Sequence, residues 1–237
     1  MSIVISNLQK QYDANFTLDI PSLNIGDGEL VGLVGNNGAG KTTLLRLILD
    51  LIEATQGRVD NNGHNVSGND EWKWWTGSFL DRSFLIDFYT PEEYFGFIAE
   101  VYHITQDELM NRLAHFLPLM NGEILDKGKI IHDFSMGNRQ KIGIIGAMLV
   151  NPKVLILDEP FNFLDPTSQH IVANLLQEMN REHGATIILS SHNLSFVNDI
   201  CTRILLLDKG HILMDHLHNA GDKDAELEHY FLYSRKS

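Results

Sequence analysis

Residues 35–43 constrain the fold more than any other part of this 237-residue chain. They read Gly-Asn-Asn-Gly-Ala-Gly-Lys-Thr-Thr, with two glycines at fixed spacing followed by lysine and a hydroxyl residue. The apolar run 29–34 before them predicts a buried strand, and the apolar run 44–52 after them predicts a buried helix. A strand, a glycine loop and a helix in this order form the context in which backbone N–H groups converge on a phosphate.

Each residue type in this loop has a physical reason. The glycines allow the backbone to curl, and the start of the following helix adds its positive dipole end. Lys41 supplies a charge for outer phosphates, and the Thr42 hydroxyl can ligate Mg²⁺. The alternative, a glycine-rich turn that happens to precede Lys-Thr, does not explain both flanking elements. The expected phosphate-binding residues are Gly35, Asn36, Asn37, Gly38, Ala39, Gly40, Lys41, Thr42 and Thr43.

The charge balance makes some classes of partner improbable. The chain has 31 acidic and 18 basic residues, so its net charge is −13, which disfavours binding to nucleic-acid phosphates or to an anionic leaflet.

The single cysteine, Cys201, fits a reducing compartment, although a small buried hydrophobe is the simpler interpretation. The sequence shows no signal peptide, and its longest apolar run, 142–150, is too short to span a bilayer. We therefore expect any membrane role to come through a partner.

A second group of polar residues follows two apolar strands. Residues 154–157 predict a strand buried on both faces, as in a parallel sheet, and it ends in Asp158 and Glu159. Ligands of such sheets lie at the carboxyl ends of the strands, so Asp158 is placed to hold Mg²⁺ and Glu159 to act on water. His192 ends the next strand, 186–192. Acidic residues also end strands for structural reasons, and a lone histidine is usually structural.

The remaining pattern predicts an α/β protein in which a mostly parallel β core carries an antiparallel β subdomain and an inserted helical lobe. Hairpins are expected around Asn62-Gly63 and Lys209-Gly210. Thr90-Pro91-Glu92-Glu93 predicts a capped helix start. We expect a single domain over residues 1–237, with residues 1–82 and 151–215 as the nucleotide-binding core lobe. Residues 83–150 would form the helical lobe, and 216–237 a polar tail with a short helix or no regular structure.

Two features have two interpretations from the residues alone. Tyr12 lies in the linker between the first two strands, where it either stacks on a nucleobase or packs as an ordinary tyrosine. Ser135 and Gly137 lie at the start of a helix, where they either bind an anion or simply cap the helix.

Taken together, these motifs resemble the ATP-binding subunits of ABC transporters over nearly the whole chain, from Tyr12 to about Met214. Residues 35–42 match Walker A, and residues 155–159 match Walker B with its following glutamate. Tyr12 stands where this family places its adenine-stacking aromatic residue. The other matches are Ser135, Gly137 and Asn138 with the signature motif, Asp165 with the D-loop, and His192 with the switch histidine.

The chain departs from the family pattern in three places. Its signature reads Phe-Ser-Met-Gly-Asn instead of Leu-Ser-Gly-Gly-Gln, which leaves Ser135 and Gly137 in place. Asp81 stands where the Q-loop glutamine is expected, and its carboxylate can still approach Mg²⁺. Asn36 stands where the family often has proline or another residue, a harmless difference.

The resemblance implies a P-loop ATPase that binds ATP and Mg²⁺ and works as a head-to-tail dimer, with a homodimer expected. Each ATP would lie between the Lys41 loop of one chain and the Ser135 segment of the other. Glu159 would act on the water and His192 on the γ-phosphate, while Asp158, Thr42 and Asp81 would serve the metal.

It also implies a separate transmembrane permease as partner, and hence a cytoplasmic protein on the inner face of the cell membrane. The aromatic-rich stretch 72–102 is the expected docking surface, and residues 94–102 are similar to those of exporters. Two alternatives stay open: a soluble ABC-type ATPase acting on ribosomes or DNA, and a regulatory nucleotide binder that does not hydrolyse ATP. The first usually has two ATPase units or a long coiled coil, and this chain has neither pattern.

Overall fold

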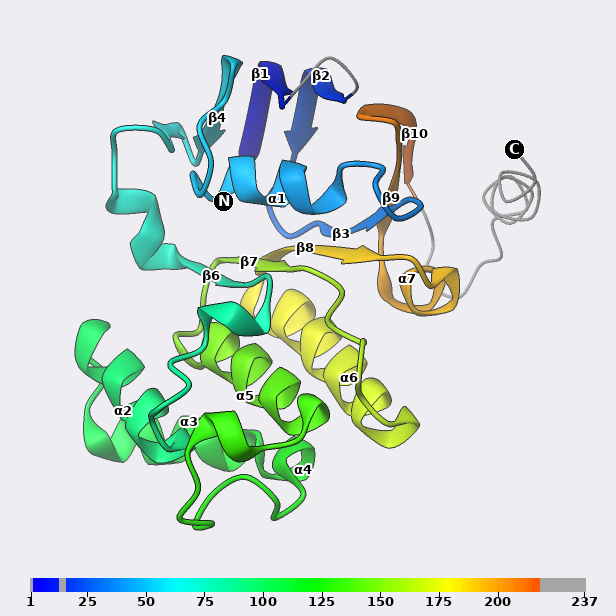
Figure 1. Cartoon of the computed structure of the whole chain (residues 1–237). Coiled ribbons are helices and arrows are strands. Elements are labelled where there is room, and N and C mark those ends of the chain that lie inside the picture. Colours follow the sequence, from blue (N-terminus) through cyan, green and yellow to red (C-terminus); the bar gives the residue numbers. More distant parts are fainter. Residues whose placement is uncertain (1, 13–15, 218–237) are drawn as a thin grey trace.

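A six-stranded sheet divides the molecule into two layers (Figure 1). The computed structural model describes residues 2–12 and 16–217. The strand order is β10-β9-β3-β8-β7-β6, and every neighbouring pair is parallel except β9 with β10. The strands are β3 (Leu30–Val34), β6 (Thr76–Phe79), β7 (Val154–Leu157), β8 (Thr186–Ser191), β9 (Arg203–Asp208) and β10 (His211–Leu217).

A second, antiparallel sheet lies on one side of the first. Its strand order is β2-β1-β4-β5. Helix α1 (Lys41–Ile48) packs between the two sheets, above β3 in Figure 1, and buries Leu44, Leu45 and Ile48 in their shared core. The strands are β1 (Ile3–Gln11), β2 (Thr17–Ile25), β4 (Gln56–Asn61) and β5 (His64–Asn65).

Helices cover the opposite face of the parallel sheet. In Figure 1, α5 (Met136–Leu149) and α6 (Pro166–His183) lie directly below it, and three more helices lie beyond them. Those three are α2 (Pro91–Val101), α3 (Gln106–His115) and α4 (Leu117–Met120). Helix α7 (Leu194–Ile200) follows β8. Short 3₁₀ turns also connect the longer elements: η1 (Glu71–Trp75), η2 (Arg82–Phe84) and η3 (Ile131–Asp133).

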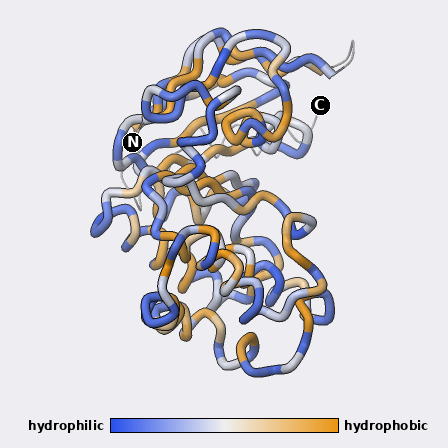
Figure 2. The backbone as a smooth tube through the Cα atoms, turned by 90° about the vertical axis from the view of Figure 1, so that its left-hand side faces the viewer, coloured by the Kyte–Doolittle hydropathy of each residue, from blue (hydrophilic) through white to orange (hydrophobic). Residues whose placement is uncertain are grey.

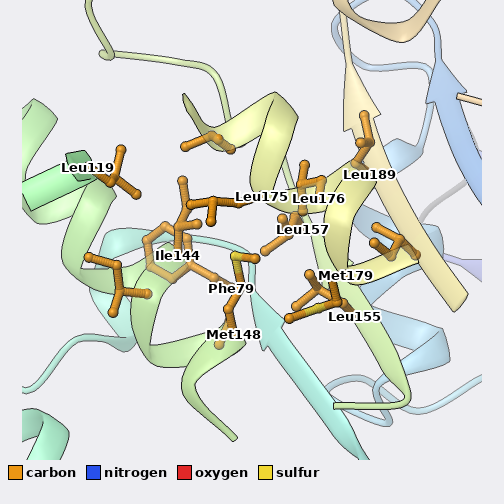
Figure 3. Packing of buried hydrophobic residues seen from close by; sticks show 14 of the residues in the cluster. Phe79, Leu119, Ile144, Met148, Leu155, Leu157, Leu175, Leu176, Met179 and Leu189 are labelled. Carbon is orange, nitrogen blue, oxygen red and sulfur yellow. The ribbon is translucent and has the colours of Figure 1, made fainter. Parts of the chain in front are cut away.

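Both faces of the central strands are buried, which explains their continuous apolar sequences. In β7, Leu155 and Leu157 pack with α5 and α6, whereas Val154 and Ile156 belong to the core around α1. Figure 3 shows the first of these cores, in which Leu155 and Leu157 lie among residues of both helices. In Figure 2 hydrophobic stretches run through the middle of the molecule and through the parts above and below it, and many outer turns are hydrophilic. This arrangement leaves the carboxyl ends of the parallel strands to carry polar residues.

Close backbone approach positions α5 on the sheet. A Cβ atom added at Gly143 would lie 2.1 Å from the ring of Phe79, so only glycine lets the helix approach β6 this closely. The position of α5 matters for the site because its first turn carries the predicted signature residues.

The fold class predicted from the sequence is confirmed: the structure is an α/β P-loop fold with a mostly parallel sheet and an additional antiparallel sheet. The two predicted hairpins are present as the pairs β4–β5 and β9–β10. Within the described residues, no helix is both long and apolar enough to cross a membrane.

Several boundaries differ from the prediction. The helix expected over 44–52 begins at Lys41 and ends at Ile48, where Asp50 adopts a left-handed φ of 50°. Within the predicted helical lobe, the chain forms α3 and α4 as separate helices, and α4 starts at Leu117 with Pro118 in its first turn, where no N–H is needed. His216 and Leu217 extend β10 instead of belonging to the tail, and the rest of the predicted tail lies outside the described residues.

Candidate functional site

The phosphate loop connects β3 to α1 and depends on glycine at several positions. Gly38 and Gly40 have φ values of 83° and 111°, which are strained for any residue with a Cβ atom. A Cβ at Gly35 would lie 2.3 Å from the backbone oxygen of Leu207 in β9. The loop conformation predicted from the sequence is therefore present, and its glycines are required by the backbone itself.

Lys41 lies at the mouth of this loop. Its side chain is only 7% exposed, and its Nζ donates to the backbone oxygens of Gly35 at 2.7 Å and Asn36 at 3.4 Å. The same Nζ lies 3.6 Å from Oε1 of Glu159. The structure thus brings the lysine of the loop beside the second of the two predicted acidic residues.

Asp158 follows β7 and contacts the loop directly. The Thr42 hydroxyl donates to Asp158 Oδ2 at 2.5 Å, and the Ser190 hydroxyl donates to Oδ1. A hydroxyl and a carboxylate side by side are ligands that Mg²⁺ accepts, and Mg²⁺ usually completes its shell with water and phosphate oxygens. In the described parts of the chain no group of three or more His, Cys, Asp or Glu side chains forms a metal cage. Thr42 and Asp158 therefore fit a magnesium ion shared with a nucleotide.

Glu159 is held from several directions. Its backbone has a left-handed φ of 48°, and its N–H donates to Ser190 Oγ at 2.9 Å. Its Oε2 lies 2.8 Å from Nδ1 of His192 and accepts a hydrogen bond from the His192 backbone N–H at 3.3 Å. The predicted base and the predicted switch histidine are thus in direct contact.

A cavity of about 370 Å³ opens beside the phosphate loop. Tyr12 lies at it with its side chain 54% exposed, and Lys10 Nζ lies 5.4 Å from the centre of its ring. The volume falls in the range of small-molecule sites. The cavity is lined by Tyr12, Phe16, Asn36, Asn37, Gly38, Gly40, Lys41, Thr42, Thr43 and Glu159.

The signature residues lie elsewhere. Ser135 caps α5, and its hydroxyl accepts a hydrogen bond from the Asn138 N–H at 3.2 Å. A Cβ at Gly137 would lie 2.8 Å from the backbone oxygen of Phe163, so this glycine packs tightly on the loop after β7. None of the three signature residues lines the cavity beside the phosphate loop of the same chain.

Asp165 and Asp81 each cap the start of a helical segment. Asp165 caps α6, and a hydrogen bond from the Ser168 hydroxyl holds the pKa of its carboxyl below the usual value. Asp81 caps η2, and the hydrogen bond from the Ser83 backbone N–H lowers its pKa. Asp81 lines a neighbouring cavity of about 200 Å³ together with Asp158 and Glu159, so it lies near the acidic pair without a hydrogen bond to it.

Three residues of the site have no signal in the sequence. Phe16 lines the cavity beside Tyr12, and its ring would be 3.1 Å from a Cβ at Gly40. Ser190 contacts both acidic residues, and Gln140 donates to the backbone oxygen of Glu159. Each acts through a contact between segments far apart in the chain, which no local motif records.

A glycine loop and acidic residues that meet at the carboxyl edge of a parallel sheet define a P-loop nucleotide-binding protein. Residues 18–162 match the family model described as ABC transporter, and the chain belongs to this family. The order of the phosphate loop, the signature segment and the acidic pair agrees with that assignment.

Individual relatives agree with the assignment. The chain is 33% identical to the methionine import ATP-binding protein MetN of Francisella tularensis over 89% of this chain and 62% of MetN. It is 30% identical to the bacitracin transport ATP-binding protein BcrA of Bacillus licheniformis over 96% of this chain and 76% of BcrA. A solved ATP-binding subunit of an ABC transporter superposes with a TM-score of 0.86 at 26% identity, covering 100% of both chains. The chain spans 54% to 76% of the length of such curated relatives.

Proposed function

We propose that this chain binds and hydrolyses ATP with Mg²⁺ and thereby powers transport of a substrate across a membrane through a separate transmembrane protein. The observation that carries the proposal is the contact of Thr42 with Asp158 at the edge of a cavity that also contains Lys41 and Glu159. The names of MetN and BcrA, one an import protein and one a transport protein, support a role in transport.

The residues divide the chemistry between them. The backbone of loop 35–43 and the Lys41 ammonium would hold the phosphates, and Thr42 and Asp158 would hold the metal. When bound, Mg²⁺ would neutralise the negative charge that develops on the phosphates. Glu159 would orient or deprotonate the attacking water. The contact with Glu159 orients the imidazole of His192. We propose that this imidazole contacts the γ-phosphate.

A second copy of the chain would complete each site. Ser135, Gly137 and Asn138 lie outside the cavity that holds the phosphate loop of their own chain, so they are available to another chain. Met136 and Phe163 beside them are 59% and 56% exposed, which is high for apolar side chains on a surface without a partner. We therefore propose that two copies pair head to tail, with a homodimer as the simplest form.

The transmembrane partner would dock on exposed aromatic residues of η1, η2 and the segment between η2 and α2. Trp74, Phe84 and Phe88 are 57%, 51% and 73% exposed there, and exposed aromatic residues often anchor interfaces. Trp72, which the sequence placed in the same surface, is 3% exposed and belongs to the core instead. Docking on such a partner would place the chain at the cytoplasmic face of the cell membrane, and residues 94–102 favour export by resemblance.

The proposal is tested by measuring ATP hydrolysis with and without Mg²⁺, first for the chain alone and then with the membrane protein that co-purifies with it. We expect Mg²⁺-dependent hydrolysis and a multi-span membrane partner. Phe88→Ala should lower transport while the ATPase activity of the chain alone is unchanged. Co-purification with ribosomes or DNA and no membrane protein would contradict the transport role, and absence of hydrolysis would contradict the ATPase role.

A further inference from the structure

The backbone of Glu159 has an unusual conformation that its neighbours must maintain. A φ of 48° is uncommon for a residue with a long side chain, and such conformations persist only where surrounding contacts determine them. Two side chains supply these contacts. Ser190 Oγ accepts the Glu159 N–H at 2.9 Å, and Gln140 Nε2 donates to the Glu159 carbonyl at 3.3 Å.

Ser190 links the two acidic residues. It lies in β8 and is fully buried. Its hydroxyl accepts from Glu159 and donates to Asp158 Oδ1, so the three residues form one directional chain of hydrogen bonds. Hydrogen bonds in such a chain polarise and strengthen one another in a buried site. The Ser190 hydroxyl therefore fixes the positions of two residues together: Asp158, which would hold the metal, and Glu159, which would act on the water.

Gln140 holds the next peptide group, the one that contains the Glu159 carbonyl. It is 5% exposed and lies in the first turns of α5, two residues beyond Asn138 of the signature segment. Its amide donates to the carbonyls of both Glu159 and Pro160 at 3.3 Å. The start of the signature helix is thus attached to the backbone that carries the predicted base.

We propose that Ser190 and Gln140 are positioning residues that hold the two peptide groups on either side of the Glu159 Cα, keep Glu159 in its left-handed conformation and so aim its carboxylate. The inference rests on the proposed function, in which Glu159 acts on the water. Neither residue lines the cavity beside the phosphate loop. Gln140 therefore acts through Glu159, and Ser190 acts through Glu159 and Asp158. Their loss should therefore lower the turnover number and leave ATP binding intact.

The first test is Ser190→Ala, compared with Thr186→Val. Thr186 lies at the other end of β8, is equally buried, and its hydroxyl accepts from the Gly28 N–H far from the site. Misplacement of a catalytic group by about 1 Å can cost about a hundredfold in rate, so we expect kcat to fall roughly ten- to hundredfold for Ser190→Ala. KM should change less than about twofold, and Thr186→Val should keep the kcat of the wild type. Ser190→Thr, which retains the hydroxyl, should recover most of the rate.

The second test is Gln140→Leu, which keeps the size of the side chain and removes its donor. We expect a smaller fall in kcat with unchanged KM. In the double variant that carries both Gln140→Leu and Ser190→Ala, the fall in kcat should be less than the product of the two single effects, because both residues hold the backbone of Glu159. Effects that multiply, or a raised KM with normal kcat, would overturn the proposal for Gln140.

A measurement that does not depend on ATPase activity separates this inference from the proposed function. Hydrogen exchange of the Glu159 amide should accelerate in Ser190→Ala and not in Thr186→Val, since only the former removes its acceptor. A wild-type chain without ATPase activity would contradict the proposed function, and the exchange measurement would still test the positioning role. A folded Ser190→Ala variant with normal kcat or an unchanged exchange rate would overturn it.

Discussion

The two halves of the candidate site are built in different ways. The phosphate half comes from one continuous stretch, residues 35–43, between a strand and a helix that are adjacent in the chain. The acidic half combines Asp158 and Glu159 after β7 with Ser190 and His192 at the end of β8, and with Gln140 from α5. The comparison shows that a phosphate cradle can be encoded locally, whereas a positioned carboxylate requires several elements to meet.

The same difference appears in the backbone. In the phosphate half, the left-handed positions Gly38 and Gly40 are glycines, for which this conformation costs little. In the acidic half, Glu159 and Phe163 have φ values of 48° and 66° and are not glycines. The Arg82 guanidinium lies 4.1 Å from the centre of the Phe163 ring and packs on it. The acidic half is therefore held by its neighbours and the phosphate half by its own sequence.

Glu159→Gln should produce the largest effect and separate the two halves most clearly. Removing a general base typically costs about 10²–10⁴-fold in rate, so hydrolysis should fall by roughly that factor. ATP should still bind, because the phosphate loop is unchanged. Single-turnover hydrolysis and nucleotide titration measure both quantities. Near-normal hydrolysis by this variant would refute the assignment of the base.

Lys41→Ala should show the opposite pattern. Hydrogen bonds to charged groups contribute about 1.5–3 kcal/mol each, so ATP affinity should fall roughly ten- to hundredfold. Titration calorimetry of the variant and of Lys153→Ala, an exposed lysine before β7, measures the change. We expect the control to bind as the wild type does. An unchanged affinity in Lys41→Ala would count against the phosphate cradle.

Tyr12→Ala tests whether the phosphate half extends to a base-binding edge. Stacking of a base on an aromatic ring contributes about 1–3 kcal/mol, so ATP affinity should fall by about tenfold. Tyr12→Phe keeps the ring and should bind ATP normally. Turnover at saturating ATP should be the same for both variants, since neither touches the acidic half. If Tyr12→Ala and Tyr12→Phe bind equally well, the ring makes no stacking contact.

Thr90→Ala should have the smallest effect of these changes, a loss of stability, and should alter neither the phosphate half nor the acidic half of the site. Thr90 caps α2 in a capping box with Glu93, and loss of such a cap typically costs about 1 kcal/mol of stability. Chemical denaturation should show this loss, with recovery in Thr90→Ser. Nucleotide affinity should be unchanged, because α2 lies on the far side of α5 from the phosphate loop (Figure 1). A large change in affinity would instead link the helical part to the phosphate half.

Much of the fold followed from local patterns. The apolar runs before and after residues 35–43 predicted β3 and α1, and Asn62-Gly63 and Lys209-Gly210 predicted two hairpins. These predictions succeed because turn conformations and the periodicity of burial are properties of short segments. The end of α1 was less predictable, since Leu49 and Leu51, on either side of Asp50, continue the apolar pattern beyond the last helical residue, Ile48.

The sequence by itself determined the phosphate loop, the acidic ends of the buried strands and the family to which the chain belongs. Only the tertiary structure decided that Trp72 is buried while Trp74 is exposed, and that Ser190 and Gln140 meet at Glu159. The physical reason is that backbone conformation and amphipathic pattern depend on neighbours in sequence. Contacts between side chains depend instead on strand order and helix packing, which bring together residues that are far apart along the chain.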